Sequence, residues 1–343
     1  MFGGIPKRRL FADGQRNGRA VDTARTPTRL SHMMLSSKQA NLLWPRHRFP
    51  GARRALSTTY RTVSLLAGRT GFQVWKMHSR LRFGSTRWAS VYDGLRVTVR
   101  IDDYRGYRIA MSHGTQKEKV LLWRQAVQFG PDICVDVGAN YGEFSVSAAA
   151  LGTKLITVEA NPMIIPCLTE TLAPYRTTTI VHAAATETDS QSQFFYNAAE
   201  TGSASIAAAG PSKAINRFRG RISTATVPTR RLDTLVPELL GRQPRSVILK
   251  MDVEGFEESV LAGALDLLDQ ADWWRAMIEF NPTALRNAGS DPARFWAALR
   301  TFPGFVVGTA RVPSAQLARL DPTLPPATPE ADCDVLIGRG TPD

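Results

Sequence analysis

Three charged side chains alternate along the short stretch LKMDVEG, at Lys250, Asp252 and Glu254. An apolar run at residues 247–249 precedes them, and a glycine and a helical pattern follow. Alternate residues of a strand point to the same side, so the three charges would share one face at the tip of a buried strand. Such a group could act in catalysis, hold a metal ion, or form the polar start of a helix.

A second polar group lies in VDVGANYGEFS, which predicts a strand, a turn and a helix. A dinucleotide fingerprint would need glycines at positions 138, 140 and 143, and only Gly138 is present. Asn140 and Glu143 therefore disfavour a pyrophosphate, and with it an NAD-dependent dehydrogenase. Asp136, Asn140 and the backbone of Gly138 and Gly142 instead form a polar cup that suits a zwitterionic amino-acid head group.

Glu159 ends the next predicted strand, KLITVEA, where an acid can bind both hydroxyls of a ribose. An amino-acid site and a ribose site at neighbouring strand ends together describe S-adenosylmethionine. We expect Asn161 and Ala184, beyond the second strand and within the third, to contribute to the same site. The alternative interpretation is a glycine turn followed by a helix-capping acid.

Strands alternate with helices from residue 91 onward, which predicts an α/β fold with a doubly wound, mostly parallel sheet. Two late strands without a helix between them predict an antiparallel edge strand. Residues 95–101 and 107–111 alternate in polarity and predict a β-hairpin before the sheet, and residues 198–222 predict a loop rich in small residues. In such folds ligands bind beyond the carboxyl ends of the strands, where the polar residues above are found.

The chain of 343 residues carries a net charge of +13, and the excess lies at its start. Residues 1–90 hold 18 Lys and Arg and two acids, a net charge of +16. The remaining residues hold 25 bases and 28 acids, a net charge of −3. Residues 1–52 predict a disordered basic leader. It is either the product of a start codon assigned too far upstream, since Met33 and Met34 lie inside it, or a targeting segment. Residues 53–90 predict a basic helical extension that lies on an anionic membrane or docks on the body.

Other classes of protein are disfavoured by composition. No apolar run is long enough to span a membrane, and no nucleic-acid-binding module is recognisable. Three separated cysteines and five scattered histidines give no metal or redox spacing, so we expect reduced thiols and a cytoplasmic protein.

The motifs VDVGANYGEFS, TVEANP, VHAAA, RRLDTL, ILKMDVEGFEESVLAGA and MIEFNP together resemble the FkbM family of S-adenosylmethionine-dependent methyltransferases. The resemblance covers about residues 90–340 and defines a predicted domain at residues 91–343. It implies the class I methyltransferase (Rossmann-like) fold and O-methylation of a hydroxyl on a sugar, glycolipid or polyketide. The alternative is an inactive methyltransferase-like scaffold for a biosynthetic partner.

Within that resemblance the stretch LKMDVEG takes a catalytic role. We expect Asp252 to accept the hydrogen bond of the acceptor hydroxyl, Lys250 to keep Asp252 ionised and orient the acceptor oxygen, and Glu254 to be shared between substrate contact and helix capping. A metal site at Asp252, Glu254 and Glu279 is the weaker alternative, so we expect no metal.

The predicted acceptor site adds a strand end and the small-residue loop. Glu279, Ser203 and Ser205 are its candidate residues, and the arginines at 217, 219 and 221 suggest an anionic or glycan acceptor. The expected partners are a small-molecule or glycolipid acceptor, without nucleic acid, and peripheral membrane contact through residues 53–83 is an open alternative.

Overall fold

The computed structural model describes residues 68–206, 222–308, 312–320 and 323–342. The predicted leader, the first part of the basic extension and the three arginines of the small-residue loop lie outside the described residues.

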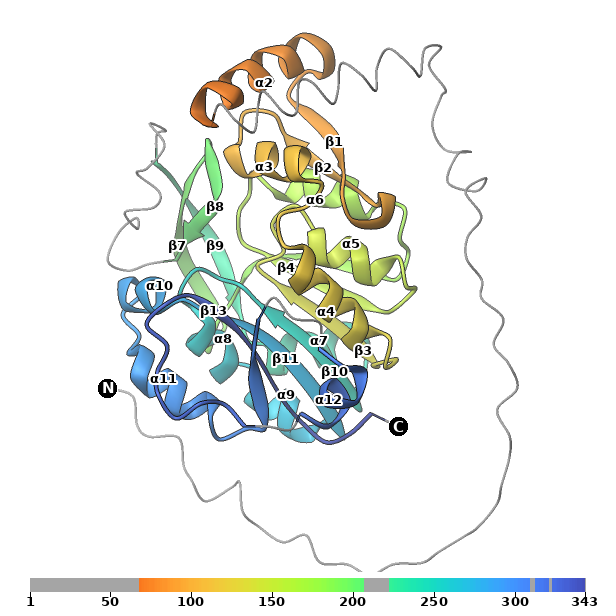
Figure 1. The fold of residues 1–343 in the computed structure, drawn as a ribbon, viewed down its shortest axis with the longest axis vertical. Helices are drawn as coiled ribbons and strands as arrows, with labels where there is room; N and C mark the ends of the chain where they lie inside the picture. The colour runs from red at the N-terminus through yellow and green to blue at the C-terminus, as the bar shows by residue number, and fades with distance from the viewer. Residues whose placement is uncertain (1–67, 207–221, 309–311, 321–322, 343) are drawn as a thin grey trace, which may run out of the picture. The chain divides into compact units, whose positions relative to one another are not determined.

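A seven-stranded sheet forms the centre of the fold, in the order β12–β13–β11–β10–β3–β4–β5 (Figure 1). Its strands are β3 (Ile133–Val137), β4 (Leu155–Glu159), β5 (Thr178–His182), β10 (Ser246–Met251), β11 (Trp273–Phe280), β12 (Gly304–Val307) and β13 (Cys333–Arg339). The five strands from β5 to β11 pair in parallel, and β13 is antiparallel to both β11 and β12. This confirms a doubly wound, mostly parallel sheet with antiparallel pairing at one edge, the class I methyltransferase arrangement.

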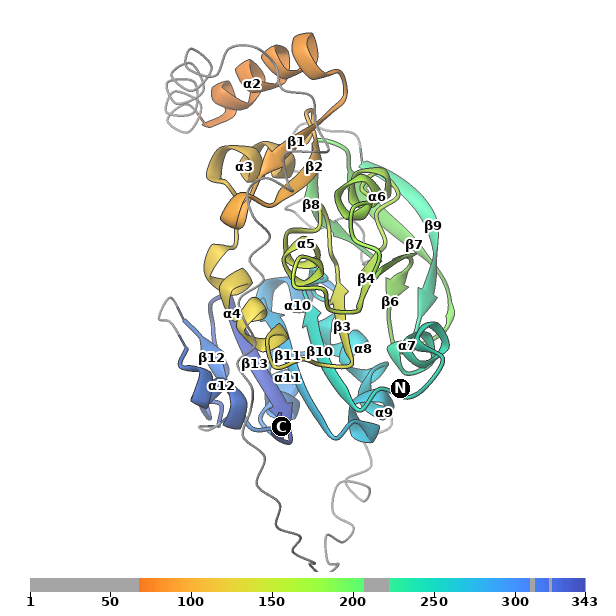
Figure 2. The same cartoon turned by 90° about the vertical axis from the view of Figure 1, so that its right-hand side faces the viewer.

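Helices cover both faces of this sheet (Figure 2). One face packs against α4 (Lys117–Val127), α5 (Glu143–Ala149), α6 (Ile165–Leu172) and α12 (Ser314–Arg319). The other packs against α7 (Leu232–Leu240), α8 (Glu257–Ala262), α9 (Leu265–Gln270), α10 (Pro282–Asn287) and α11 (Pro292–Leu299). Alternate residues of β3 enter the two cores, Cys134 the first and Val135 the second, which is why the strands read as continuous apolar runs.

A second sheet of four strands lies beside the first, in the order β6–β9–β7–β8. Its strands are β6 (Ala184–Ala185), β7 (Ser190–Asn197), β8 (Glu200–Ser205) and β9 (Ile222–Arg230). The first part of the loop predicted at residues 198–222 is the strand β8, paired with β7.

The N-terminal part of the described chain contains α2 (Gly68–Phe83), β1 (Thr86–Ser90), a short 3₁₀ turn η1 (Tyr92–Gly94), β2 (Arg96–Arg100) and α3 (Tyr104–Ser112). A β-hairpin is present, and its strand β2 confirms the strand predicted at residues 95–101, but β2 pairs with β1 and not with residues 107–111. The predicted second strand is helix α3, so this part of the prediction is wrong.

The cause is a helix cap at Asp103. Its carboxylate accepts a hydrogen bond from the backbone N–H of Arg105, and so satisfies a donor that the first turn of α3 leaves open. The fully buried Asp103 also accepts from the Tyr141 hydroxyl at 2.6 Å and from the Thr201 hydroxyl at 2.6 Å. Long-range contacts therefore decide the conformation of a segment whose short alternation favoured a strand, and they tie α3 to the β3–α5 turn and to β8.

No helix in the described ranges is both long and apolar enough to cross a bilayer. All three cysteines carry free thiols, as the sequence predicts.

Candidate active site

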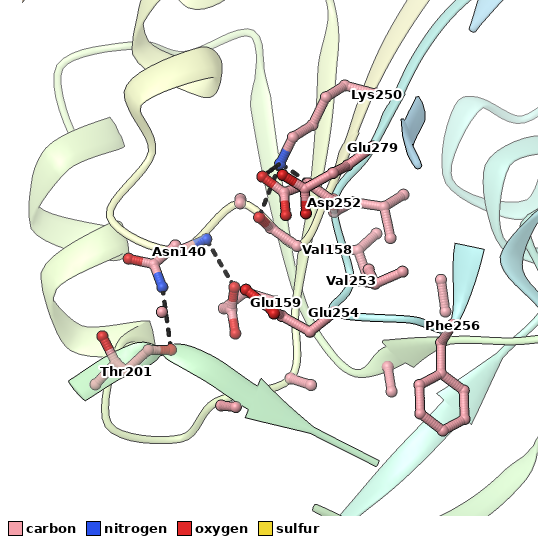
Figure 3. Close-up of a pocket in the computed structure, with 18 of the residues that line it drawn as sticks. Asn140, Val158, Glu159, Thr201, Lys250, Asp252, Val253, Glu254, Phe256 and Glu279 are labelled. Carbon is pink, nitrogen blue, oxygen red and sulfur yellow. Dashed lines mark hydrogen bonds and ion pairs between the residues drawn. The ribbon is translucent and has the colours of Figure 1, made fainter. Parts of the chain in front are cut away.

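A cavity opens at the carboxyl ends of β3, β4, β10 and β11, and β8 contributes to its wall (Figure 3). Its empty space is about 960 Å³, part of which is continuous with solvent. The predicted site residues that line it are Gly138, Asn140, Glu159, Ala184, Lys250, Asp252, Glu254 and Glu279. Residues from separate strand ends thus meet in one place, as the geometry of a doubly wound sheet requires.

The turn between β3 and α5 lies against the tip of β10. Gly138 has a φ of +73°, and a Cβ at this position would lie 1.9 Å from the carbonyl oxygen of Asp252. Only glycine lets the two strand ends approach this closely. Gly142 also has a positive φ, but a Cβ there would meet Leu168 of α6, so this glycine serves helix packing and does not line the cavity.

Glu159 is buried at the end of β4, with 6% of its surface exposed. Its Oε2 accepts from the N–H of Asn140 at 2.7 Å, and its Oε1 accepts from the N–H of Asn161 at 2.7 Å. Each oxygen keeps further acceptor capacity, so the carboxylate can bind two vicinal hydroxyls from the cavity. Burial raises the pKa of Glu159, and the two backbone donors oppose that rise. Asn161 is itself buried and does not line the cavity, so it holds the turn.

Asp136 and Lys250 form a buried ion pair that follows from the register of β3 and β10, where they are direct partners. Asp136 is fully buried and does not line the cavity, so it is not part of the predicted polar cup. The Lys250 Nζ lies 3.3 Å from Asp136, and it donates to the carbonyl oxygens of Gly138 at 2.9 Å and Val137 at 3.3 Å. Two of the ammonium donors thus go to carbonyl oxygens and the charge faces Asp136, which fixes Lys250 on the β3–α5 turn; its role in orienting an acceptor oxygen stays a prediction.

Lys250 does act on Asp252 through its charge. Its Nζ lies 3.8 Å from the Asp252 Oδ2. Burial pushes the pKa of Asp252 upward, but the charges of Lys250, Lys119 and Arg105 outweigh it and lower that pKa below its usual range. The predicted role of Lys250 in keeping Asp252 ionised is therefore consistent with the geometry.

Asp252, Glu254 and Glu279 bring one carboxylate oxygen each within 4.8 Å of one another. Three like charges this close cannot all be ionised, so their pKa values separate. The charge of Asp252 and burial raise the pKa of Glu279 to about 8, and burial followed by the charge of Glu279 raises the pKa of Glu254 well above its usual range. Within the cluster the pKa of Asp252 is therefore lowered, while the pKa values of Glu254 and Glu279 are raised.

Glu254 lies before helix α8, not in its first turn. It has a left-handed φ of +54°, and α8 begins at Glu257. The buried Glu257 carboxylate accepts from the N–H groups of Val253 at 2.9 Å and Gly255 at 3.0 Å. The capping role predicted for Glu254 is thus wrong, because Glu257 holds this turn.

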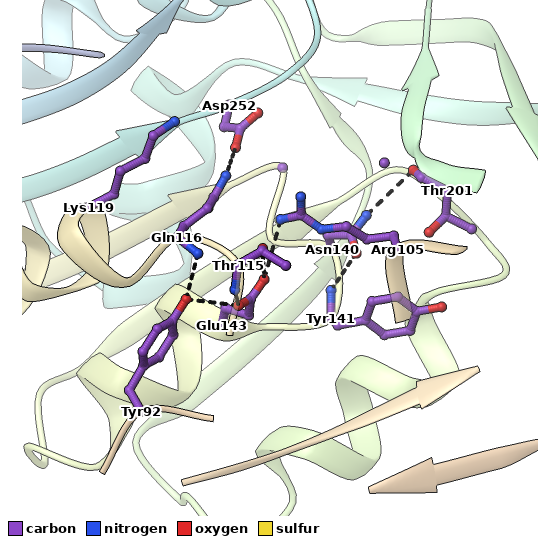
Figure 4. A network of polar contacts seen from close by, with 12 residues as sticks. Tyr92, Arg105, Thr115, Gln116, Lys119, Asn140, Tyr141, Glu143, Thr201 and Asp252 are labelled. Carbon is purple, nitrogen blue, oxygen red and sulfur yellow. Dashed lines mark hydrogen bonds and ion pairs between the residues drawn. The ribbon is translucent and has the colours of Figure 1, made fainter. Parts of the chain in front are cut away.

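Several residues from the N-terminal part of the chain also reach the site, and the sequence did not point to them (Figure 4). The Gln116 Nε2 donates to the Asp252 Oδ2 at 3.4 Å. Lys119, in the first turn of α4, lies 3.4 Å from Glu279 and 2.7 Å from Asp334. Their only local signal was the polar start of a predicted helix, because both contacts cross more than a hundred residues of sequence.

Glu143 organises the same region. Its buried carboxylate accepts from the Tyr92 hydroxyl at 2.9 Å, from the Thr115 N–H at 2.8 Å, from the Thr115 hydroxyl at 2.9 Å and from Arg105 at 3.3 Å. The Tyr92 hydroxyl in turn accepts from the N–H of Gln116 at 2.9 Å. The segment before α4 is thereby fixed against the start of α5 and next to the reacting end of the cavity.

Ser203 and Ser205 belong to β8 by their backbone, but their side chains lie outside the described part of the structure. Their neighbours Thr201, Gly202 and Ala204 do line the cavity. The strand that carries the two serines thus borders the cavity, and their role in binding the acceptor stays a prediction.

Residues 136–305 match the family model described as the methyltransferase FkbM domain. The matched segment runs from the end of β3 to β12 and contains the β3–α5 turn, Glu159 and the carboxylate cluster. No curated protein matches the chain.

Solved methyltransferase structures are similar to this chain only loosely. Magnesium protoporphyrin IX methyltransferase from Synechocystis PCC 6803 is 14% identical, with 82% of this chain and 97% of that chain covered and a TM-score of 0.35. An rRNA methylase from Streptococcus thermophilus is 11% identical, with coverages of 64% and 95% and a TM-score of 0.34. Precorrin-6y C5,15-methyltransferase from Geobacter metallireducens GS-15 is 12% identical, with coverages of 66% and 90% and a TM-score of 0.33. These scores are too low to carry any conclusion about the reaction.

Proposed function

We propose that the chain methylates a hydroxyl oxygen of a sugar, glycolipid or polyketide acceptor. Its match to the methyltransferase FkbM domain over residues 136–305 makes it an S-adenosylmethionine-dependent methyltransferase. The observation that carries the proposal is the ionised Asp252 at the tip of β10, in the wall of the cavity and beside Gly138. A hydroxyl acceptor needs such a base, since it must lose its proton during the transfer.

The described residues fit the donor. Glu159 offers two carboxylate oxygens for a pair of ribose hydroxyls, next to an apolar wall of Val158, Ala183, Ala184 and Ala185 that suits a purine ring. S-adenosylmethionine supplies the methyl group as an electrophile on a sulfonium. Lys250 holds the β3–α5 turn and Asp252 in a fixed relation, because it binds the carbonyl oxygens of the turn and lies beside Asp252.

Asp252 then accepts the proton of the acceptor hydroxyl while the hydroxyl oxygen takes the methyl group. Gln116 orients the carboxylate through its amide hydrogen bond. Glu279, whose pKa is raised to about 8, can both donate and accept hydrogen bonds when protonated, and Glu254 lies beside it in the wall of the cavity, which suits further hydroxyls of the same acceptor. This mixture of donors and acceptors supports a polyhydroxylated acceptor.

The test combines binding with activity. Calorimetry should detect S-adenosylhomocysteine and not NAD, and a labelled methyl donor should transfer its label to a sugar-containing fraction of a cell extract. The linkage of the product should be stable to mild base, as an ether is and a methyl ester is not. Donor binding without transfer to any fraction would support the inactive scaffold instead, and label that ribonuclease releases would refute the proposed acceptor.

A further inference from the structure

We propose that Arg105 binds the carboxylate of the donor's amino-acid part, a role that the sequence had given to the backbone of the β3–α5 turn. The backbone N–H groups of this turn are already used. Gly138 and Ala139 donate to the carbonyl oxygen of Val158, and Asn140 donates to Glu159. The next two N–H groups also bond within the turn, to the side chain of Asn140 and to the carbonyl oxygen of Ala139. A carboxylate therefore needs another donor.

Arg105 supplies that donor. Among the described residues that line the cavity, the cationic side chains are Arg105 and Lys250, and Lys250 is held by two carbonyl oxygens and by its ion pair with Asp136. Arg105 has five N–H donors, and one of them donates to the Glu143 carboxylate at 3.3 Å. Its Nε is buried without a hydrogen-bond partner. A guanidinium with donors to spare matches a carboxylate in a two-point contact.

Glu143 positions Arg105 and leaves most of its N–H donors available. The Glu143 carboxylate already accepts three shorter hydrogen bonds from Tyr92 and Thr115, so the contact with Arg105 is its longest. Asp103, two residues before Arg105, fixes the start of α3 through its bonds to Tyr141 and Thr201. The backbone beneath the guanidinium is thus held in place from two sides of the cavity.

A pair of ligands separates this role from a general effect on the site. S-adenosylhomocysteine carries the amino-acid part, and 5′-methylthioadenosine lacks it but keeps the nucleoside. Arg105→Gln should weaken S-adenosylhomocysteine binding by about 10- to 150-fold, the range for a hydrogen bond to a charged group, and leave the binding of 5′-methylthioadenosine unchanged. Arg105→Lys should recover part of the affinity, because it keeps the charge and loses the two-point geometry.

Arg108→Gln is the matched control, since Arg108 is an exposed arginine on the same helix and should affect neither ligand. An equal loss of affinity for both ligands in Arg105→Gln would make Arg105 a structural residue, and no loss for either would place it in the acceptor site. Both results would overturn the assignment. The test leaves the identity of the methylated oxygen aside, so its failure is separate from failure of the proposed acceptor class.

A second inference rests on helix α2, whose two faces are both apolar. One face is buried through Phe72, Trp75 and Ser79. The rings of Phe72 and Trp75 lie 5.5 Å and 5.4 Å from the ring of Tyr107 on α3. Figure 1 shows α2 next to α3. The opposite side exposes Val74, Met77 and Leu81, which are 41%, 63% and 84% exposed and fall three and four residues apart. The helix docks on the body and still presents an apolar stripe.

The stripe is unusual within the described structure. Seven large apolar side chains are exposed in the described residues, and three of them form the stripe on α2. The remaining four lie singly on β1, α4 and α7 and just after α5. Single exposed apolar residues need no explanation, whereas a row on one helix marks a contact surface. The sequence of α2 also contains four bases, at positions 69, 76, 80 and 82, and no acid.

We infer that this face of α2 docks on an anionic lipid surface. Aliphatic side chains bordered by bases match the apolar interior and the negative headgroups of such a surface, and they do not match the hydrated phosphates of nucleic acid. Residues 1–90 contain 18 bases and two acids, and this positive charge adds a long-range attraction to the negative headgroups. Since α3 contacts α2 and carries Arg105 into the cavity, docking would bring the active site close to lipid-linked acceptors.

Vesicle co-sedimentation of the full chain tests this surface. The chain should bind phosphatidylcholine vesicles that contain phosphatidylserine, bind phosphatidylcholine alone less, and lose binding in high salt. Met77→Glu with Leu81→Glu should lower the partition coefficient about tenfold or more, while Leu239→Glu, at an exposed leucine of α7, should not change it. If the chain bound neither kind of vesicle, because its own N-terminal residues or a second copy covered this face of α2, the inference would be overturned. Equal binding by the α2 variant would do the same.

Discussion

Lys250→Met tests whether one buried ammonium group holds the two halves of the active site together. Lys250 is 4% exposed and its partner Asp136 is fully buried. Methionine has a similar length and no charge, so the substitution leaves Asp136 in the core without its cation. Breaking a buried ion pair in this way costs about 3–5 kcal/mol. We expect the free energy of unfolding to fall by that amount.

The geometry explains why the loss should lie in this range and not near that of a surface pair. Lys250 donates to the carbonyl oxygens of Val137 and Gly138 and forms an ion pair with Asp136, so two acceptors lose their donor and one buried carboxylate loses its counter-ion together. Lys119→Met is the comparison: its side chain is 25% exposed and its partners are partly solvated, so it should cost about 1 kcal/mol or less.

Urea unfolding followed by circular dichroism measures both variants. Asp136→Asn combined with Lys250→Met should recover much of the loss, because the core then holds no unpaired charge. The neighbouring acids raise the pKa of Lys250 against the opposing effect of burial. Its contribution is therefore complete below the unfolded pKa of about 10.4 and is lost only as pH rises through the higher folded value. A loss below about 1 kcal/mol for Lys250→Met near neutral pH would refute the view that Lys250 holds the β3–α5 turn against β10.

Three further results are expected from the carboxylates of the cavity. Glu159→Ala should weaken S-adenosylhomocysteine binding by about 1.5–3 kcal/mol, and unchanged calorimetric affinity in a folded variant would remove Glu159 from the ribose role. Asp252→Asn should keep donor binding and lower turnover about 10²–10⁴-fold in a labelled-methyl assay, more than Glu254→Gln does, and the reverse order would move the base to Glu254. Glu279 has a pKa raised to about 8, so its stabilisation is complete below the unfolded value and is lost as pH rises through 8. Glu279→Gln should therefore flatten the fall in unfolding free energy between about pH 5 and 9, and an unchanged slope in urea titrations would contradict the shift.

The elements that the sequence predicted well are those whose signal is local. The strands β3, β4 and β10 are short apolar runs that end in glycine or acid, and both faces of each are buried. The glycine at 138 was also readable, since a strand that turns sharply into a helix needs a positive φ at that point. These features placed the predicted donor residues at the edge of the sheet where the cavity lies.

The errors arose where long-range contacts outweigh local preference. Residues 107–111 alternate like a strand, but the buried Asp103 caps a helix there with support from Tyr141 and Thr201. Asp136 looked like a ligand of the donor because it precedes the glycine turn. The pleat of β3 instead directs it to Lys250 across the sheet, a pairing that requires the strand order and cannot be read from either segment alone.

The cavity is built from two parts of the chain with different roles. The matched segment supplies the turn, the ribose acid and the carboxylate cluster, while Arg105, Gln116 and Lys119 come from helices before it. Those three residues bind charged groups at the reacting end, whereas the hydrogen-bond partners of Glu159 in the described structure are Asn140 and Asn161. Changes in α3 and α4 should therefore alter the acceptor end and the amino-acid end of the donor and leave the nucleoside end unaffected. It follows that the family match alone cannot specify the acceptor, because part of the wall that meets the acceptor lies in residues outside the matched segment.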